Sequence, residues 1–125
     1  KGDFAYNPAR INVGSIAKYE GDNPCMISSL YVCFRPKYNI SSEWLQHLLK
    51  SQRMIYNYNL FGEGGVRIYL FFPNFGRIKI SIPPLEEQKK IAAVISTIEQ
   101  KISVENFILD KLNTQKSFLL TKMFI

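Results

Sequence analysis

The chain has 125 residues, a formal net charge of +6 at pH 7 and a hydrophobic fraction of 46%. This length leaves room for one domain and an appendage, and it excludes a large catalytic domain beside them. The hydrophobic fraction excludes a disordered tail. No run reaches the roughly 20 apolar residues that a membrane-spanning helix needs.

The positive charge is unevenly spread along the chain. Residues 1–82 hold ten Lys/Arg and five Asp/Glu, whereas residues 83–125 hold six and five. This distribution favours a basic module that faces a polyanion, followed by a nearly neutral assembly element. A merely basic surface without such a partner fits the charge equally well.

The cysteines and the histidine limit the chemistry that the chain can carry. Cys25 and Cys33 have neither CxxC nor zinc-knuckle spacing, and they alternate with apolar residues. We therefore predict two buried thiols in a cytoplasmic protein. His47 is the single histidine, which argues against a His-dependent triad and against a multi-histidine metal site. No metal site is expected.

The first elements along the chain are short strands and loops, punctuated by Gly2, Pro8 and Gly14. The stretch "FAYNPARINVGSIA" contains Asn7-Pro8 after an aromatic residue, which resembles the Asn-Pro-Pro-aromatic catalytic loop of DNA amino-methyltransferases. That loop needs an aromatic at its fourth position, where this chain has Arg10. The sequence also lacks a glycine-rich cofactor loop between a strand and a helix. These differences argue against methyl transfer and against any catalytic residue here.

The same stretch has the side chains of a DNA-reading surface. Arginine forms bidentate pairs with guanine, asparagine pairs with adenine, and lysine and tyrosine reach phosphates. The predicted DNA-binding residues are Tyr6, Asn7, Arg10, Asn12, Ser15, Lys18, Tyr19 and Arg67.

The middle of the chain alternates between strand and helix patterns. "CMISSLYVCFRP" is rich in β-branched and aromatic residues and predicts a strand that ends at Pro36. "ISSEWLQHLLKSQRMIYNY" has apolar residues at helical spacing and predicts one helix of three to four turns. "GEGG" then breaks the chain and presents Arg67 on a loop. "VRIYLFF" and "RIKISIP" predict two further strands joined by a helical turn at "PNFG".

From Leu85 to about Lys122 there is no Gly or Pro, and the pattern becomes that of a coiled coil. Large apolar residues follow alternating steps of four and three, interrupted by Glu105 and Lys116. These two opposite charges suit pairing with another helix in antiparallel sense. The predicted interface residues are Ile91, Ile95, Ile98, Ile102, Glu105, Leu109, Leu112, Lys116, Leu119 and Met123.

A helix of about 38 residues is about 57 Å long, and a globular part of about 82 residues is only some 25–30 Å across. We therefore expect another chain or segment to bury much of the seam. The predicted fold class is α+β: a small mixed or antiparallel sheet with one or two short helices, followed by a long coiled-coil helix. The predicted boundary separates residues 1–82 from residues 83–125.

The junction "IKISIPPLEEQKKIAAVISTIEQKI" resembles that of the DNA specificity subunits of Type I restriction–modification enzymes. The matching residues are Pro83, Pro84, Leu85, Glu87, Gln88 and Ile91. "GDFAYNPARINVGSIA" resembles a motif of their target recognition domains, "SLYVCFRPK" resembles the central strand, and "LLTKMF" resembles the usual C-terminus. The resemblance covers essentially the whole chain.

The resemblance implies a non-catalytic subunit that reads one half of a bipartite sequence in double-stranded DNA. It implies that residues 1–82 are a partial target recognition domain. The long helix is implied to be a spacer that docks methyltransferase subunits and, through them, restriction subunits. S-adenosylmethionine, ATP and Mg would belong to those partners, and no cofactor to this chain. In isolation, the helix could pair with a second copy.

An alternative from another functional class also fits the residues. In this interpretation the chain is a coiled-coil assembly module whose basic domain binds protein rather than DNA. An autonomous methyltransferase or nuclease fits the residues least well.

Overall fold

The computed structural model of the protein describes residues 1–124. The chain divides into two compact units, Lys1–Ala92 and Ala93–Ile125. The first contains a small sheet, three short helices and the first turns of the long helix, and the second contains the rest of that helix. The α+β prediction is thereby confirmed.

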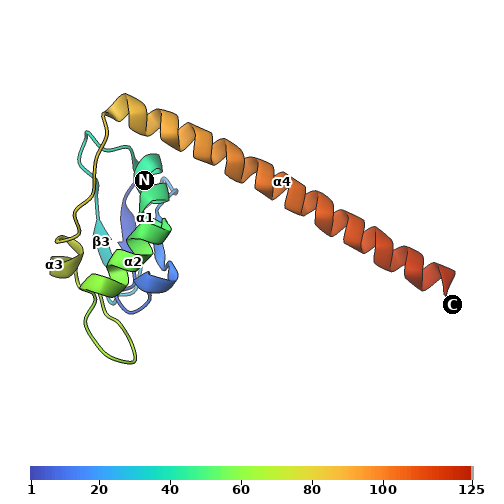
Figure 1. Ribbon diagram of the computed structural model, residues 1–125, viewed down its shortest axis with the longest axis horizontal. Helices are drawn as coiled ribbons and strands as arrows, with labels where there is room; N and C mark the ends of the chain where they lie inside the picture. Colours follow the sequence, from blue (N-terminus) through green and yellow to red (C-terminus); the bar gives the residue numbers. More distant parts are fainter. Residues whose placement is uncertain (125) are drawn as a thin grey trace. The chain divides into compact units, whose positions relative to one another are not determined.

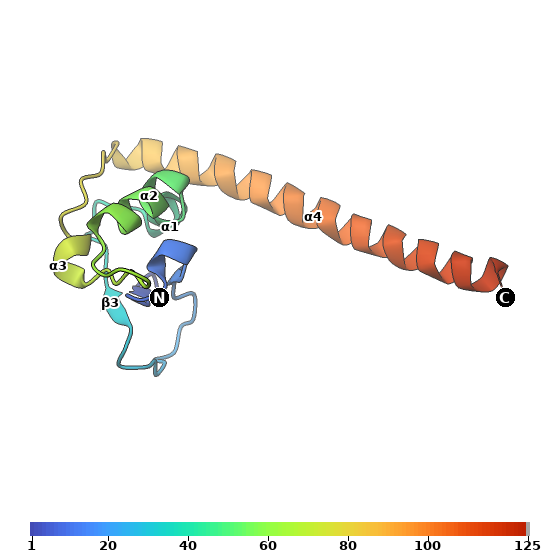
Figure 2. The same cartoon turned by 60° about the horizontal axis from the view of Figure 1, so that its bottom comes forward.

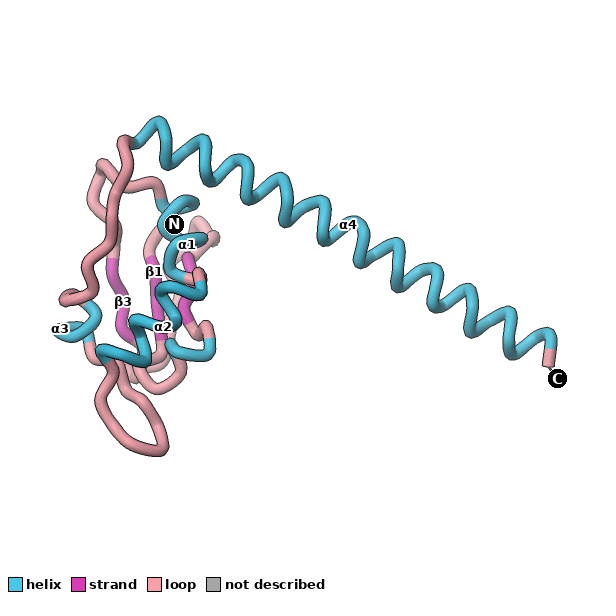
Figure 3. Tube along the Cα trace, in the orientation of Figure 1, coloured by secondary structure: helices cyan, strands magenta, loops and turns pink. Residues whose placement is uncertain are grey.

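A three-stranded antiparallel sheet forms the middle of the first unit (Figure 3). The central strand β1 (Phe4–Tyr6) lies between β2 (Ile16–Lys18) and β3 (Val32–Phe34). Tyr6 faces Ile16 on one side and Val32 on the other. Because side chains alternate along a strand, one face of the sheet carries large apolar residues and the other carries small ones.

Two helices cover the apolar face of the sheet, and Figure 2 shows them on the side opposite the chain that joins β2 to β3. They are α1 (Ser42–Leu49) and α2 (Gln52–Phe61). Each begins at a serine cap: Ser41 accepts a hydrogen bond from the Trp44 N–H, and Ser51 accepts one from the Met54 N–H, both at 3.3 Å. Such caps satisfy amides that have no partner within the helix.

The core lies between this sheet face and the two helices. Its buried residues are Phe4, Tyr6, Ile11, Ile16, Trp44, Leu45, Leu49, Met54, Tyr58, Leu70 and Ala92. Aromatic rings make its centre: the rings of Tyr6 and Phe75 lie 5.1 Å apart, and those of Phe4 and Phe34 lie 5.3 Å apart. Stacked rings at these distances add to the free energy gained by burial. A predicted helical turn at "PNFG" is confirmed as α3 (Phe72–Phe75).

The long helix α4 (Leu85–Met123) follows an extended segment that ends in two prolines (Figure 1). Gln88, in the first turn, is completely buried. Its Oε1 accepts a hydrogen bond from the Ser41 N–H at 2.8 Å. Its Nε2 donates to the carbonyl oxygens of Pro83 at 2.8 Å and Asn39 at 3.2 Å. One side chain therefore ties the start of α4 to the start of α1.

Several predicted elements were wrong in extent. The helix expected after Pro36 is two helices, because Ser51 caps a new helix instead of continuing the first one. The strand predicted from Cys25 onward is reduced to β3. Neither "VRIYLFF" nor "RIKISIP" is a strand, although Glu63 and Tyr69 form an isolated bridge. Ile78 and Ile80 instead pack against the core.

The prediction of two buried thiols was also wrong, since Cys25 and Cys33 are both exposed. Alternation along β3 explains Cys33. Val32 and Phe34 pack against the core, so the side chain between them lies on the opposite face. Cys25 lies in the exposed chain between β2 and β3.

Replacing Gln88 by leucine should lower the free energy of unfolding by about 3 kcal/mol or more. The change leaves one N–H and two carbonyl groups without the partner that they have now, and unsatisfied buried groups cost about 1–3 kcal/mol each. Urea unfolding of the Gln88→Leu variant measures the loss. The exposed Lys90 on the same helix provides the control, and Lys90→Ala should change the free energy little. Equal stabilities of the two variants would contradict the anchoring role.

Tyr6 gives a second prediction, because its buried hydroxyl has no hydrogen-bond partner among the described residues. Burial raises the pKa of Tyr6 to about 12, from an ordinary value of 10.0. Between these two values the unfolded chain has lost the proton and the folded chain still holds it, so stability falls as pH rises. Tyr6→Phe should therefore be at least as stable at pH 7 and lose less stability between pH 10 and 12.

Tyr58→Phe is the matched control for this measurement. The hydroxyl of Tyr58 donates to the carbonyl oxygen of Leu49 at 2.7 Å, at the end of α1. Its removal should lower stability at pH 7 by about 1 kcal/mol or more. If chemical unfolding shows the same loss at pH 7 for both variants, the hydroxyl of Tyr6 has a partner in solution.

Candidate nucleic-acid interface

The loop of residues 7–15 is a rigid turn that carries four of the predicted DNA-binding residues. The Asn7 N–H donates to the Ser15 carbonyl oxygen at 3.1 Å, and the Asn7 Oδ1 accepts from the Ala9 N–H at 3.0 Å. A short 3-10 helix, η1 (Ile11–Val13), ends at Gly14, whose φ is +89°. Buried Ile11 anchors the loop in the core. Arg10 is exposed at its start, and Asn12 and Ser15 are partly exposed.

A hairpin loop of residues 62–70 is fastened to the first loop through its backbone. The buried Leu70 donates its N–H to the Pro8 carbonyl oxygen at 3.0 Å. Two backbone bonds of 2.8 Å between Glu63 and Tyr69 close the hairpin, and the exposed Arg67 lies within it. The structure therefore brings Arg67 onto a loop that is anchored beside residues 7–15, as a recognition surface requires.

Asn59 of α2 is a third contributor, and sequence reasoning missed it. Its Nδ2 donates to the Ile55 carbonyl oxygen at 3.0 Å, so its Oδ1 is left to accept from the Asn12 Nδ2 at 3.3 Å. A backbone carbonyl can only accept, and this fixes the orientation of both amides. Asn12 is thus held in one orientation. Had the restart of the helix at Ser51 been recognised, the helical period would have put Asn59 on an exposed face.

Three predicted residues are not part of this surface. Tyr6 is completely buried in the core, so we remove it from the DNA-binding set. The side chain of Lys18 is only 7% exposed and forms ion pairs with Glu20 at 3.0 Å and Glu43 at 3.2 Å. Tyr19 donates its hydroxyl to the Asn23 carbonyl oxygen.

The charge of Lys18 is neutralised by two carboxylates of the chain, Glu20 and Glu43. Burial alone would lower the pKa of Lys18, but hydrogen bonds to Glu20 and Glu43 outweigh it and raise the pKa. Arg35 is similarly engaged, because its guanidinium donates two bonds to Asp3, at 2.6 and 2.7 Å. This bidentate pair lowers the pKa of Asp3. These two cations therefore pair with carboxylates of the chain itself.

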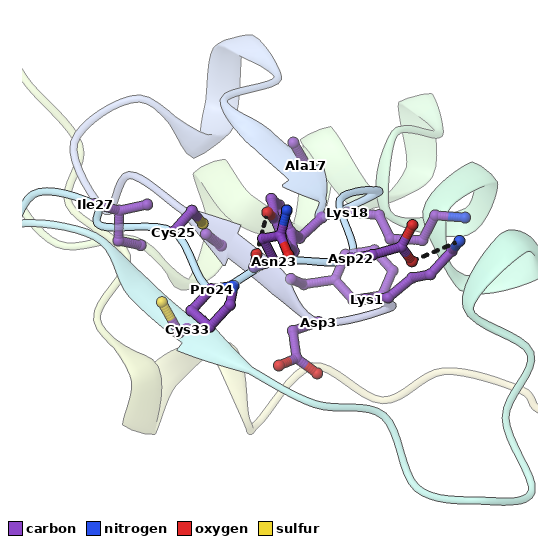
Figure 4. A pocket seen from close by; sticks show the side chains of 13 residues that line it. Lys1, Asp3, Ala17, Lys18, Asp22, Asn23, Pro24, Cys25, Ile27 and Cys33 are labelled. Carbon is purple, nitrogen blue, oxygen red and sulfur yellow. Dashed lines mark hydrogen bonds and ion pairs between the residues drawn. The ribbon is translucent and has the colours of Figure 1, made fainter.

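The opposite face of the sheet carries a cavity of about 520 Å³ (Figure 4). Small side chains of the three strands form its floor: Ala5, Ala17 and Cys33. Tyr19, the chain from Asp22 toward Ile27, and the side chains of Lys1, Asp3, Phe4 and Lys18 also line it. No arginine lines it, so this cavity lacks the bidentate base-reading side chains of the loop surface.

The predicted coiled-coil seam beyond Ala92 has exposed apolar side chains. Ile98, Ile102, Leu109, Leu112, Leu119 and Met123 are between 47% and 73% exposed. Glu105 and Lys116 are also exposed. Ile91, which lies before Ala92, instead packs against the core of the first unit. Ile95 is partly buried.

Comparison with known proteins places the chain in a family. Residues 4–114 match the family model of the Type I restriction modification DNA specificity domain. The chain belongs to this family. The MjaX specificity subunit of a type I restriction enzyme from Methanocaldococcus jannaschii is 28% identical over 125 residues, 97% of this chain and 29% of that protein. The MjaVIII specificity subunit from the same organism is 42% identical over 50 residues, 40% of this chain and 12% of that protein.

This specificity domain therefore spans less than a third of the length of the two relatives. Among the residues that the structure describes, no helix is long and apolar enough to cross a membrane. The same residues contain no group of three or more His, Cys, Asp or Glu side chains placed to hold a metal ion.

Substitution of the two glycines Gly64 and Gly65 tests the backbone conformation of the hairpin of residues 62–70. Gly64 has φ +120°, and a Cβ there would lie 2.2 Å from the Arg67 carbonyl oxygen. Gly64→Ala should therefore distort the hairpin. We expect amide NMR shifts to change throughout residues 62–70 while the urea midpoint changes little. A Cβ on Gly65 meets no atom within 4 Å, so Gly65→Ala is the control. Similar spectra for both variants would contradict the hairpin geometry.

Proposed function

We propose that the protein is the DNA-reading part of a Type I restriction–modification specificity subunit and reads one half of a bipartite site in double-stranded DNA. The family match over residues 4–114 is the observation that carries this proposal. The loop surface supports it independently, because exposed arginines and a fixed asparagine amide are suited to base edges in the major groove.

The proposed reading residues differ from those expected from sequence alone. Arg10 and Asn12 remain as candidates for base contacts, and Arg67 for a base or phosphate contact. Asn7 and Ser15 shape the loop through their hydrogen bonds. Asn59 joins the set because it holds Asn12. Lys18 and Tyr19 leave it because their polar groups are engaged elsewhere.

The protein is proposed to have no catalytic activity of its own. Its relatives are named as specificity subunits, and the loop at Asn7-Pro8 lacks the aromatic that would stack on a flipped base. In this proposal, methyl transfer and its S-adenosylmethionine belong to methyltransferase subunits. Restriction, with its ATP and Mg, belongs to restriction subunits that join through them. The protein then works in the cytoplasm, where those subunits and the DNA are.

The long helix is proposed as the spacer and the docking element for the methyltransferase subunits. Its exposed apolar seam supports this role, because contiguous apolar surface on a soluble protein marks an interaction site. In this proposal, the residues that read DNA lie before residue 83 and the residues that dock the methyltransferase subunits lie after it.

Arg10→Ala should lower the discrimination between target and random duplex by about 1–3 kcal/mol, if Arg10 pairs with a base. Methylome sequencing of a host that carries the full-length gene supplies the target sequence. Binding of both duplexes is then measured by fluorescence anisotropy. The exposed Arg77 is the matched control, and Arg77→Ala should leave the discrimination unchanged. An equal loss on both duplexes would make Arg10 a phosphate contact.

A salt series in the same assay separates DNA reading from protein binding. The affinity for duplex should fall steeply and linearly with log salt, since each phosphate contact releases counterions. A flat response together with persistent self-association would favour the alternative of an assembly module whose basic domain binds protein.

A further inference from the structure

The chain that leaves the hairpin loop toward α3 is held in place at residues 69–71. The N–H and the carbonyl oxygen of Tyr69 both pair with Glu63 at 2.8 Å. Phe71 has an extended backbone and is the N-cap of α3. Leu70, between them, is completely buried. Because side chains alternate along an extended chain, Tyr69 and Phe71 project from one face, away from the core.

The rings of Tyr69 and Phe71 are nearly parallel and lie at the surface. Their centroids are 6.1 Å apart, and their planes differ by 10°. Tyr69 is 38% exposed and Phe71 is 51% exposed, so contact between the rings leaves much of both in water. The other Phe and Tyr ring pairs described for residues 1–124 each include a ring that belongs to the core or packs against it. Aromatic rings at a surface are enriched where partners bind, because each buries a large apolar area.

This ring pair lies where the two proposed reading loops meet. The Leu70 N–H donates to the Pro8 carbonyl oxygen at 3.0 Å, so the backbone between the two rings is bonded to the loop of residues 7–15. Arg67, two residues before Tyr69, is exposed and brings positive charge to the same hairpin. A partner that suits both exposed rings and a neighbouring cation is a nucleic acid, whose bases are flat and whose phosphates are anionic.

The spacing of the two rings suits one flat heterocycle between them. Side chains two residues apart on an extended chain are separated by about 6.8 Å, at about 3.4 Å per residue. A base stacked on two rings needs nearly the same separation, because stacked bases follow one another at about 3.4 Å. The observed 6.1 Å therefore has to widen by less than about 1 Å.

We propose that Tyr69 and Phe71 form an aromatic clamp for one nucleobase that leaves the stack of the bound duplex. The inference rests on the proposed DNA-reading function and adds a second mode of recognition to it. Arg10 and Asn12 read the edges of paired bases, whereas the clamp holds the two faces of an unpaired one. It responds to how easily a base leaves the duplex, which depends on sequence because pyrimidine–purine steps unstack readily.

Stacking in the clamp offsets what the base loses when it leaves the duplex. The base gives up its two stacked neighbours and its pairing partner, and it gains one aromatic ring on each face. The lost pairing is not replaced by the two rings, so the clamp works on DNA that the reading loops already hold. A base without a pairing partner should enter the clamp more readily than a paired one.

A mismatch scan of the target duplex tests the clamp. Each duplex of the scan carries one mismatch in place of one base pair, and fluorescence anisotropy measures its binding by the full 125-residue chain. One mismatch should bind about tenfold more tightly, or more, than the fully paired target, because its base no longer loses a partner when it leaves the stack. A scan in which no mismatch tightens binding would overturn the clamp.

Substitutions of the two rings show whether the tighter binding depends on them. Tyr69→Leu and Phe71→Leu should each abolish it, because leucine keeps apolar area but has no flat face. Tyr69→Phe should retain it, because the ring remains. The urea midpoints should stay close to that of the parent chain, since both rings face away from the core. Tyr38 is 98% exposed and lies outside both loops, so Tyr38→Leu is the control and should retain the tighter binding.

Two outcomes with these variants would also overturn the clamp. In one, the mismatch still tightens binding in both leucine variants. In the other, the leucine variants bind every duplex like the parent chain and lose only their association with methyltransferase subunits, which would make the rings a protein contact.

The same measurements separate the clamp from the proposed function. Discrimination by the parent chain between the fully paired target and random duplex reports on DNA reading alone. Discrimination without a mismatch that tightens binding overturns the clamp and leaves the proposed function standing. A parent chain that binds target and random duplex equally, and no mismatch more tightly, overturns both.

Discussion

The side-chain amide of Gln88 is the constraint on which the rest of the structure depends. It is completely buried, and a buried amide must find partners for its donors and its acceptor. It finds them in the N–H of Ser41 and in the carbonyl groups of Pro83 and Asn39. The two prolines before the helix end the extended segment, and the Pro84 carbonyl oxygen accepts from the N–H groups of Glu87 and Gln88. The Pro-Pro-Leu-x-Glu-Gln motif is therefore a joint between chain segments.

This joint links the start of α4 to the helices that support the proposed DNA-reading loops. The Ser41 N–H donates to the Oε1 of Gln88, and the Ser41 hydroxyl caps α1 by accepting from the Trp44 N–H. The carbonyl at the end of α1 is satisfied by Tyr58 of α2. Asn59, the next residue of α2, accepts a hydrogen bond from the side-chain amide of Asn12. Hydrogen bonds at the two ends of α1 and on α2 thus link the first turn of α4 to the loop of residues 7–15 through these helices, all within the first unit.

Much of the fold could be predicted because its signals are local. The long helix follows from the absence of Gly and Pro and from a regular apolar step, and it ends within a residue of the expected position. The helical turn at "PNFG" follows from its proline and glycine. By contrast, the two strands expected after "GEGG" depended on partners elsewhere in the chain. The alternating pattern correctly predicts that Ile78 and Ile80 pack against the core. It does not predict a neighbouring strand for this segment to pair with, and none is formed.

The sequence suggested which loop carries the candidate site, but it did not indicate which side chains are buried or already paired. Residue types identified the loop of residues 7–15, because its mixture of Arg, Asn and Ser suits base edges. Tyr6 is no longer proposed as a DNA contact because it is buried, and Lys18 is no longer proposed because it forms ion pairs within the chain. The burial of Tyr6 and the ion pairs of Lys18 could not be predicted from sequence, because both depend on which face of the sheet packs against the helices. Asn59 was missed because its role is a contact with a residue 47 positions away.

We propose that the loops of residues 7–15 and 62–70 read duplex DNA. Amide hydrogen–deuterium exchange of the full chain, with and without its target duplex, tests this proposal. DNA should slow exchange in these two loops and leave exchange unchanged in the chain between β2 and β3, at the cavity face. Protection of the cavity face with unchanged exchange in the two loops would contradict it.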